Sequence, residues 1–226
     1  MDIIEPWLRS ASWINKLRQP SLSAEPISLE YALRIFDSLA ARNDLAFDYT
    51  KDGCAARAHL MCEAVMALGL KAHKAWAFAE KNIQESATEG ELIKKISVVL
   101  PNNKVDPDLE WDFHVTLALP VRLPNGKVEF LVFDPCFFDG PVLLGDWSKI
   151  LDIPYYQART EKFGRVPSEH NYYDYLPGYM STKKALSDPN GKYFPRRYID
   201  DLLKIKVPRR SVHPSPLRER YSPKPP

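Results

Sequence analysis

The sequence predicts an α+β fold in which two helices come first and an antiparallel sheet follows. Two segments, residues 28–42 and 54–68, carry apolar side chains at helical spacing. From residue 71 onward the pattern changes to short apolar runs and to alternation with a period of two, which is typical of strands. Helices followed by a run of strands indicate an α+β domain rather than a doubly wound fold.

The first predicted helix covers residues 28–42. Ser28 stands before the periodic segment and suits an N-cap, because its hydroxyl can accept a hydrogen bond from a free backbone N–H. The apolar positions of this helix are Leu29, Ala32, Leu33, Phe36, Leu39 and Ala40. We expect this helix to pack its apolar face on the core.

The second predicted helix begins at Cys54, directly after Asp52-Gly53, and runs to Leu68. Gly69 follows and can adopt the left-handed conformation that often ends a helix. Its apolar stripe consists of Ala58, Met61, Val65 and Leu68. We expect the helix to be largely buried.

At least four strands are predicted, at residues 72–78, 96–100, 113–119 and 128–133. The segment Pro124-Asn125-Gly126-Lys127 is a good hairpin turn, because Asn-Gly accepts positive φ. Antiparallel pairing of strands 111–121 and 128–134 around it would bring His114 next to Asp134.

Alternation along the strand separates His114 from its most apolar neighbours. Trp111, Phe113 and Val115 share one face in a regular strand, whereas His114 falls on the other. We therefore expect His114 to face away from the most apolar layer.

Cys54 is the first candidate nucleophile. Backbone N–H groups and the dipole at a helix N-terminus favour a thiolate over a thiol. An unpaired cysteine is also commonly a small buried apolar residue, but Cys54 lies outside the apolar stripe. By contrast, we expect mid-helix Cys62 to belong to the core, and Cys136 either to pack or to line the site.

The order Cys54, His114, Asp134 suits a catalytic triad. Such chemistry requires a thiolate, an imidazole that acts as base and then acid, and a carboxylate that orients the imidazole. Two alternatives stay open at this point. A strand histidine can be purely structural, and Asp134 can simply start a turn before Pro135.

A metal site is the rival arrangement. The available soft ligands are Cys54, His59, Cys62, His73, His114 and Cys136. Cys54 and His59 would lie about 140° apart around their helix and so would not converge on one ion. The sequence contains no Cys-x-x-Cys or His-x-x-x-His pair, so we expect no metal and no cofactor.

The composition is that of an ordinary globular protein, with 226 residues, 45% hydrophobic and 27% charged residues, and a formal net charge of +2. No apolar run approaches the roughly 20 residues of a membrane-spanning helix. Residues 1–27 carry no recognisable Sec signal, so we expect a cytoplasmic location or export by another route, as for a secreted effector.

We expect three regions along the chain. They are an N-terminal appendage (1–27), a catalytic domain (28–206) with its motif core at about 50–150, and a disordered basic, proline-rich tail (207–226). Tyrosines at 155–179 could stack on bases, but no RNA-binding pattern accompanies them. We therefore expect no nucleic-acid partner.

Three sequence blocks together resemble the bacterial protein-glutaminase family, which is similar in fold to transglutaminases and papain-like cysteine enzymes. The blocks are Asp52-Gly53-Cys54-Ala55-Ala56-Arg57-Ala58-His59, Trp111-x-Phe113-His114-Val115, and Phe133-Asp134-Pro135 followed by Gly140-Pro141-Val142 and Trp147. The resemblance implies that Cys54 is the nucleophile, His114 the general base and acid, and Asp134 the residue that orients His114.

The same resemblance implies deamidation of protein-bound glutamine, with a protein or peptide bearing an exposed glutamine as the partner. We expect the chain to be a monomer. A lysine amine in place of water would make the enzyme a transglutaminase, and a thiol peptidase could use the same triad. A binding module that retains the fold with an unreactive Cys54 is the alternative from another class. The stretch Lys81–Asp108 and the aromatic C-terminal region have no matching counterpart in the family.

Overall fold

The computed structural model describes residues 25–81, 92–153, 158–162, 199–207 and 211–221. Its centre is a six-stranded sheet in the order β10-β2-β7-β8-β9, with β1 also paired to β7. The strands are β1 (Ile27–Ser28), β2 (His73–Phe78), β7 (Phe113–Arg122), β8 (Val128–Phe133), β9 (Val142–Leu143) and β10 (Ala158–Lys162). Every pairing in this sheet is antiparallel except that of β1 with β7.

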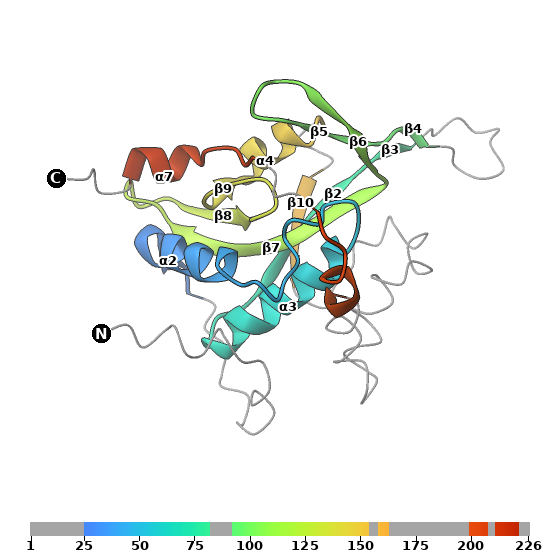
Figure 1. Cartoon of the computed structure of the whole chain (residues 1–226). Helices are drawn as coiled ribbons and strands as arrows, with labels where there is room; N and C mark the ends of the chain where they lie inside the picture. The colour runs from blue at the N-terminus through green and yellow to red at the C-terminus, as the bar shows by residue number, and fades with distance from the viewer. Residues whose placement is uncertain (1–24, 82–91, 154–157, 163–198, 208–210, 222–226) are drawn as a thin grey trace.

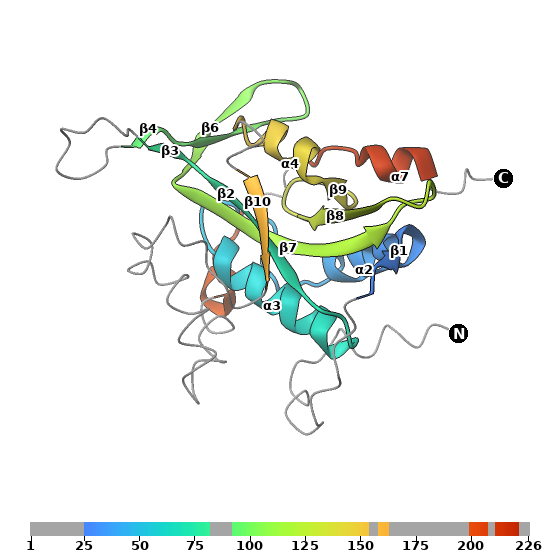
Figure 2. The ribbon, with the colours of Figure 1, turned by 180° about the vertical axis from the view of Figure 1, so that it is seen from behind.

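Helices cover both faces of this sheet. Helices α2 (Leu29–Ala40) and α3 (Cys54–Ala67) lie on one side of the long strand β7, and α4 (Leu144–Ile150) and α7 (Pro216–Tyr221) lie on the other (Figures 1 and 2). Two small strand pairs extend from the sheet: β3 (Glu80–Lys81) with β4 (Leu92–Lys94), and β5 (Ile96–Val99) with β6 (Val105–Trp111). The predicted α+β class is confirmed, and β6 is a strand that the sequence did not reveal.

Both predicted helices form where their patterns indicate. The Ser28 hydroxyl accepts a hydrogen bond from the Tyr31 backbone N–H at 3.2 Å and so caps α2, which packs Phe36 against Phe133 of β8 at 6.1 Å between ring centroids. Helix α3 begins after Gly53, whose φ is +82°, and ends just before Gly69, whose φ is +79°. The burial predicted for this helix is confirmed, because its buried set extends beyond the apolar stripe to polar Arg57 and His59.

The predicted hairpin between β7 and β8 is confirmed, with the register running from Leu117 opposite Phe133 to Arg122 opposite Val128. Its turn is closed by a hydrogen bond from the Leu123 N–H to the Lys127 carbonyl at 2.8 Å.

The prediction for Trp111 is wrong. The chain leaves regular strand geometry at Asp112, so Trp111 ends β6 while β7 starts at Phe113. Strict alternation of faces holds only within one regular strand, and this break lets the Trp111 ring stack on His114 instead of pointing away from it. His114 is also enclosed rather than facing an open side, because both faces of β7 are buried.

Residues 211–221, which lie within the segment predicted as a tail, pack against the body of the domain. The Ser215 hydroxyl donates to the Pro141 carbonyl at 2.6 Å, and it accepts from the Arg218 N–H at 3.3 Å as the cap of α7. Arg218 also forms an ion pair with Asp37 of α2. The high proline content of this segment suggests an extended chain. However, Ser215-Pro216 starts helix α7, and Pro216 occupies the first helical position, which suits proline.

Several sequence expectations lie outside the described residues, including those for residues 1–24 and for the tyrosines at 155–179. Among the described helices, none has the length and apolar character needed to span a membrane.

Candidate active site

Cys54 is the first residue of α3. Gly53 before it has a φ of +82°, and a Cβ at this position would lie 2.4 Å from Cδ1 of Leu202, so this turn requires glycine. Cys54 is partly exposed, whereas Cys62 and Cys136 are buried. Among these three thiols, Cys54 is therefore the one most accessible to a substrate.

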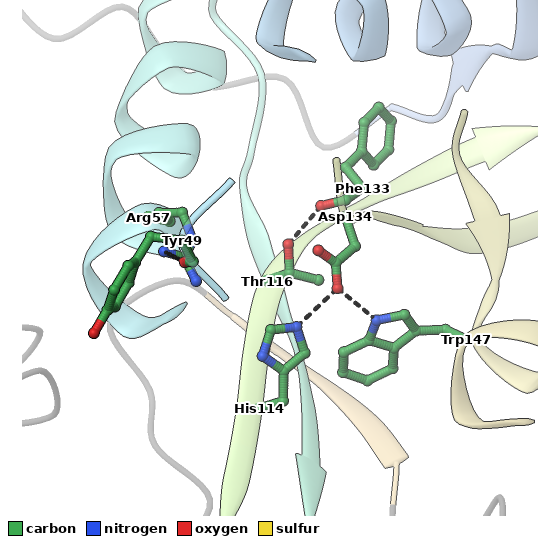
Figure 3. Close-up of polar contacts among 7 residues, drawn as sticks. All are labelled: Tyr49, Arg57, His114, Thr116, Phe133, Asp134 and Trp147. Atoms are coloured by element: carbon green, nitrogen blue, oxygen red, sulfur yellow. Dashed lines mark hydrogen bonds and ion pairs between the residues drawn. The ribbon is translucent and has the colours of Figure 1, made fainter. Parts of the chain in front are cut away.

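His114 and Asp134 form a buried hydrogen-bonded pair, with Nε2 of the imidazole 2.8 Å from Oδ2 of the carboxylate (Figure 3). Extending the β7–β8 register by one residue places Asp134 opposite Thr116, which is on the same face as His114 two residues earlier. The hairpin register therefore explains the contact. With Nε2 committed to the carboxylate, Nδ1 is the ring nitrogen left for another partner.

Burial and pairing act in opposite directions on this pair. Burial lowers the pKa of His114, but the charge and hydrogen bond of Asp134, together with a hydrogen bond and charge from Cys54, raise it to about 9. Burial raises the pKa of Asp134, but His114, the Trp147 hydrogen bond and the charge of Arg57 hold that pKa below its ordinary value. The structure therefore brings all three side chains selected from the sequence together, and it favours a charged His114–Asp134 pair.

Trp147 of α4 is a site residue whose contact the sequence did not predict. Its indole Nε1–H donates to Oδ2 of Asp134 at 2.9 Å, the same oxygen that accepts from His114 (Figure 3). The tryptophan is fully buried. The only sequence signal for Trp147 was its place in the third block that resembles the family. No hydrophobic period or turn in the sequence predicts that α4 packs against the end of β8.

Three aromatic rings enclose the imidazole. Trp111 stacks on His114 with ring centroids 4.9 Å apart and an interplanar angle of 19°, and Phe137 presents an edge at 5.6 Å. Trp147 lies at 5.7 Å. This packing keeps water from most of the ring and fixes its orientation, and His114 is only 2% exposed.

Arg57, in the first turn of α3, is a second buried residue that the sequence did not single out. Its Nη1 donates to the Tyr49 carbonyl at 2.8 Å and approaches the Ala46 carbonyl at 3.4 Å. Figure 3 shows its guanidinium beside Tyr49, on the side of the site from which α3 starts. The only sequence signal was its place in the family-like block around Cys54, three residues after the cysteine.

The two other cysteines are in different surroundings. Burial raises the pKa of the Cys62 thiol to about 12, which agrees with the predicted core role. Burial also raises the pKa of Cys136 to about 12, and the nearby Asp134 carboxylate adds to this effect through its charge and a hydrogen bond. Cys136 therefore packs beside the Asp134 carboxylate as a thiol.

A cavity of about 200 Å³ opens beside Cys54. It is lined by Thr50, Lys51, Asp52, Cys54, Lys95, Glu110, Trp111, Asp112 and Phe113. A larger cavity of about 680 Å³ lies between α2 and residues 202–207 and does not reach Cys54. We take the smaller one as the approach to the site because it contains the accessible thiol and the ring stacked on His114.

The described part of the chain contains no group of three or more His, Cys, Asp or Glu side chains arranged to hold a metal ion.

A family model described as Glutaminase matches residues 32–151. No curated protein matches the sequence. Among solved structures, a mutant of pro-protein-glutaminase is similar with a TM-score of 0.50 and 18% identity, over 79% of this chain and 62% of that one. Another pro-protein-glutaminase crystal structure matches with a TM-score of 0.45 and 19% identity, over 65% of this chain and 50% of that one.

The NMR structure of protein-glutaminase from Chryseobacterium proteolyticum matches with a TM-score of 0.49 and 18% identity, over 74% of this chain and 89% of that one. The chain thus spans half to about three fifths of the two pro-proteins. At these identities the likeness concerns the fold.

Proposed function

The chain belongs to the glutaminase family, and from this premise we propose that it hydrolyses the side-chain amide of glutamine residues in a protein or peptide, releasing ammonia and leaving glutamate. The observation that carries the proposal is the buried 2.8 Å contact of His114 with Asp134, next to the accessible Cys54 at the start of α3. A thiol, an imidazole and a carboxylate in this relation are the parts that acyl transfer through a cysteine requires.

In the proposed first half-reaction, the Cys54 thiolate attacks the amide carbon. A C–S bond forms and the amide oxygen takes up the negative charge, with the backbone N–H of Cys54 at the helix N-terminus as one donor to it. As this intermediate collapses, the C–N bond breaks and His114 gives its proton to the leaving nitrogen, so ammonia departs. The products are a thioester and a neutral imidazole.

In the second half-reaction, the neutral imidazole takes a proton from water while the water oxygen attacks the thioester carbon. The C–S bond then breaks, which releases the glutamate carboxyl group and restores the thiolate and the protonated imidazole. Asp134 serves both halves in the same way. It accepts from Nε2, so that Nδ1 stays directed at the reacting atoms, and its charge stabilises the imidazolium.

The test is ammonia release from glutamine-containing proteins, combined with mass spectrometry of the product. We expect conversion of glutamine to glutamate without cleavage of the chain. Peptide cleavage in this assay would identify a peptidase, and incorporation of an added amine in place of deamidation would identify a transglutaminase; either result would overturn the proposal.

Cys54→Ala should reduce turnover by about 10⁴-fold or more while the protein stays folded, because no other group can form the thioester. Cys62→Ala is the matched control, since this thiol is buried in the core. It should lower the free energy of unfolding by about 1 kcal/mol and leave turnover in place. Loss of activity in folded Cys62→Ala with activity retained in Cys54→Ala would refute the assignment of the nucleophile.

A further inference from the structure

Arg57 lies on the turn of α3 that follows the proposed nucleophile. An arginine is rarely buried unless its charge and its donors are matched, yet Arg57 is only 2% exposed. It does not line the cavity beside Cys54. We therefore do not expect Arg57 to contact the substrate directly.

One side of Arg57 holds the chain that leads into Cys54. Nη1 donates to the Tyr49 carbonyl at 2.8 Å and is 3.4 Å from the Ala46 carbonyl, and the backbone N–H of Arg57 donates to the Gly53 carbonyl at 2.9 Å. Nη1 also packs against Gly53, since a Cβ built there would lie 3.1 Å from it. The side chain thus ties two points of the segment 46–53 to the first turn of α3, in addition to the backbone bond to Gly53 that any residue at this position would make.

The segment held by Arg57 contains an unusual backbone conformation. Ala46 has a φ of +52°, a left-handed conformation that a residue with a side chain rarely adopts. Buried carbonyls without a donor cost free energy, and the guanidinium supplies a donor to the Tyr49 carbonyl, whereas the Ala46 carbonyl also accepts from the Tyr49 N–H at 3.1 Å. The backbone N–H of Cys54, the proposed oxyanion donor, takes its direction from the same turn.

The other side of Arg57 concerns the carboxylate. Four groups act on Asp134: His114 from β7, Trp147 from α4, Arg57 from α3 and Cys136 from the loop after β8. Of these, His114 and Arg57 are the ones that can carry positive charge. The charge of Arg57 adds to the effects of His114 and Trp147, which favour the ionised carboxylate.

We propose that Arg57 is a positioning residue that shapes the turn carrying Cys54 through the side-chain hydrogen bonds of its guanidinium. For the reaction itself this inference rests on the proposed function. Arg57→Lys keeps the charge, but its ammonium ends one bond short of Nη1, and Arg57→Gln loses the charge and is shorter still. Both substitutions remove the tie to the Tyr49 carbonyl.

The first measurement is the rate of Cys54 alkylation by iodoacetamide as a function of pH, followed in the full chain by mass spectrometry. Arg57→Lys and Arg57→Gln should both slow the alkylation by about 3-fold or more at every pH, because the turn that presents the thiol loses its tie to the Tyr49 carbonyl. Arg34→Met is the matched control, since Arg34 pairs with Glu30 on the exposed surface of α2 and should change nothing.

The second measurement is the kinetics of ammonia release. Arg57→Lys should lower kcat by about 10-fold with KM unchanged, because the lysine ammonium ends one bond short of Nη1 and Arg57 does not touch the cavity.

A residue that merely supports the fold would lower the free energy of unfolding and leave the folded protein fully active. An unchanged alkylation rate together with an unchanged kcat in folded Arg57→Lys would therefore overturn the proposal. Should Arg57→Gln not fold, Arg57→Lys alone decides it. Because alkylation needs no glutamine substrate, an absence of ammonia release in the unaltered protein would refute the proposed function without deciding the role of Arg57.

Discussion

The indole Nε1–H of Trp147 donates to Oδ2 of Asp134 at 2.9 Å, which is the same carboxylate oxygen that accepts from His114. One oxygen therefore receives two N–H groups from two different elements, α4 and β7. Trp147 therefore fixes the rotamer of the carboxylate, and the carboxylate in turn fixes the orientation of the imidazole. The proposed base is thus positioned through Asp134 by a residue of α4, which lies outside the sheet.

Trp147→Phe should separate this positioning effect from simple packing. The substitution retains an aromatic ring but removes the donor, so the carboxylate is freer to rotate away from His114. We expect kcat for ammonia release to fall by about 10-fold. The free energy of unfolding, measured by urea titration, should fall by about 2 kcal/mol from the lost hydrogen bond and volume. Unchanged kcat in a destabilised variant would show that Trp147 only fills space.

Asp134→Asn should move the alkaline limb of the pH profile of kcat/KM. An amide oxygen can still accept from both N–H groups, but the negative charge that opposes burial and raises the pKa of His114 is gone. With that pKa at about 9 in the unaltered protein, the alkaline limb should lie near this value, because the imidazolium must protonate the leaving nitrogen. In the variant the limb should move down by a unit or more. A limb at the same pH in both proteins would contradict the assignment of His114 as the acid.

The same pair predicts how stability depends on pH. The pKa of His114 is raised from 6.5 to about 9 by folding, so its contribution is complete below 6.5 and is lost as pH rises through about 9. Asp134 has a lowered pKa, so its contribution is present above 3.8 and is lost as pH falls through its folded value. Urea titrations of the unaltered protein should thus show stability declining between pH 6.5 and 9, with a smaller decline in His114→Gln.

Gly53→Ala and Gly69→Ala form a matched pair at the two ends of α3. Both glycines have positive φ, +82° and +79°, so each substitution should cost about 1 kcal/mol of backbone strain. Only at Gly53 would the new Cβ collide with Leu202, whereas nothing lies within 4 Å of it at Gly69. Thermal unfolding should show the larger loss for Gly53→Ala, and only this variant should also lose turnover. Equal losses of stability in the two variants would mean that the Leu202 side chain moves away from the new Cβ at little cost.

Ser215→Ala should reveal how firmly the C-terminal segment is bound. The buried hydroxyl donates to Pro141 and caps α7, so its removal leaves a buried carbonyl without this donor and should cost about 2 kcal/mol. Ser28→Ala is the comparison, because that hydroxyl makes only an exposed cap and should cost about 1 kcal/mol. If the two variants unfold at the same denaturant concentration, the C-terminal segment contributes less than its contacts suggest.

Features with a local cause could be predicted from the sequence. Ser28 and Gly69 mark helix ends through backbone chemistry, and the Asn125-Gly126 turn sets the hairpin register. Because an antiparallel register determines which residues face each other, the sequence also predicted the contact between His114 and Asp134, although these residues are 20 positions apart.

What the sequence by itself determined is therefore the order of elements, the cysteine at a helix start and the histidine and aspartate on one hairpin. The tertiary structure alone decided that Trp147 contacts Asp134, that Arg57 binds the Tyr49 carbonyl, that Trp111 stacks on His114, and that Ser215 binds the Pro141 carbonyl. These contacts depend on how separate elements pack across the sheet. Packing is set by the shapes and charges of many side chains at once, and no local period or turn in the sequence records it.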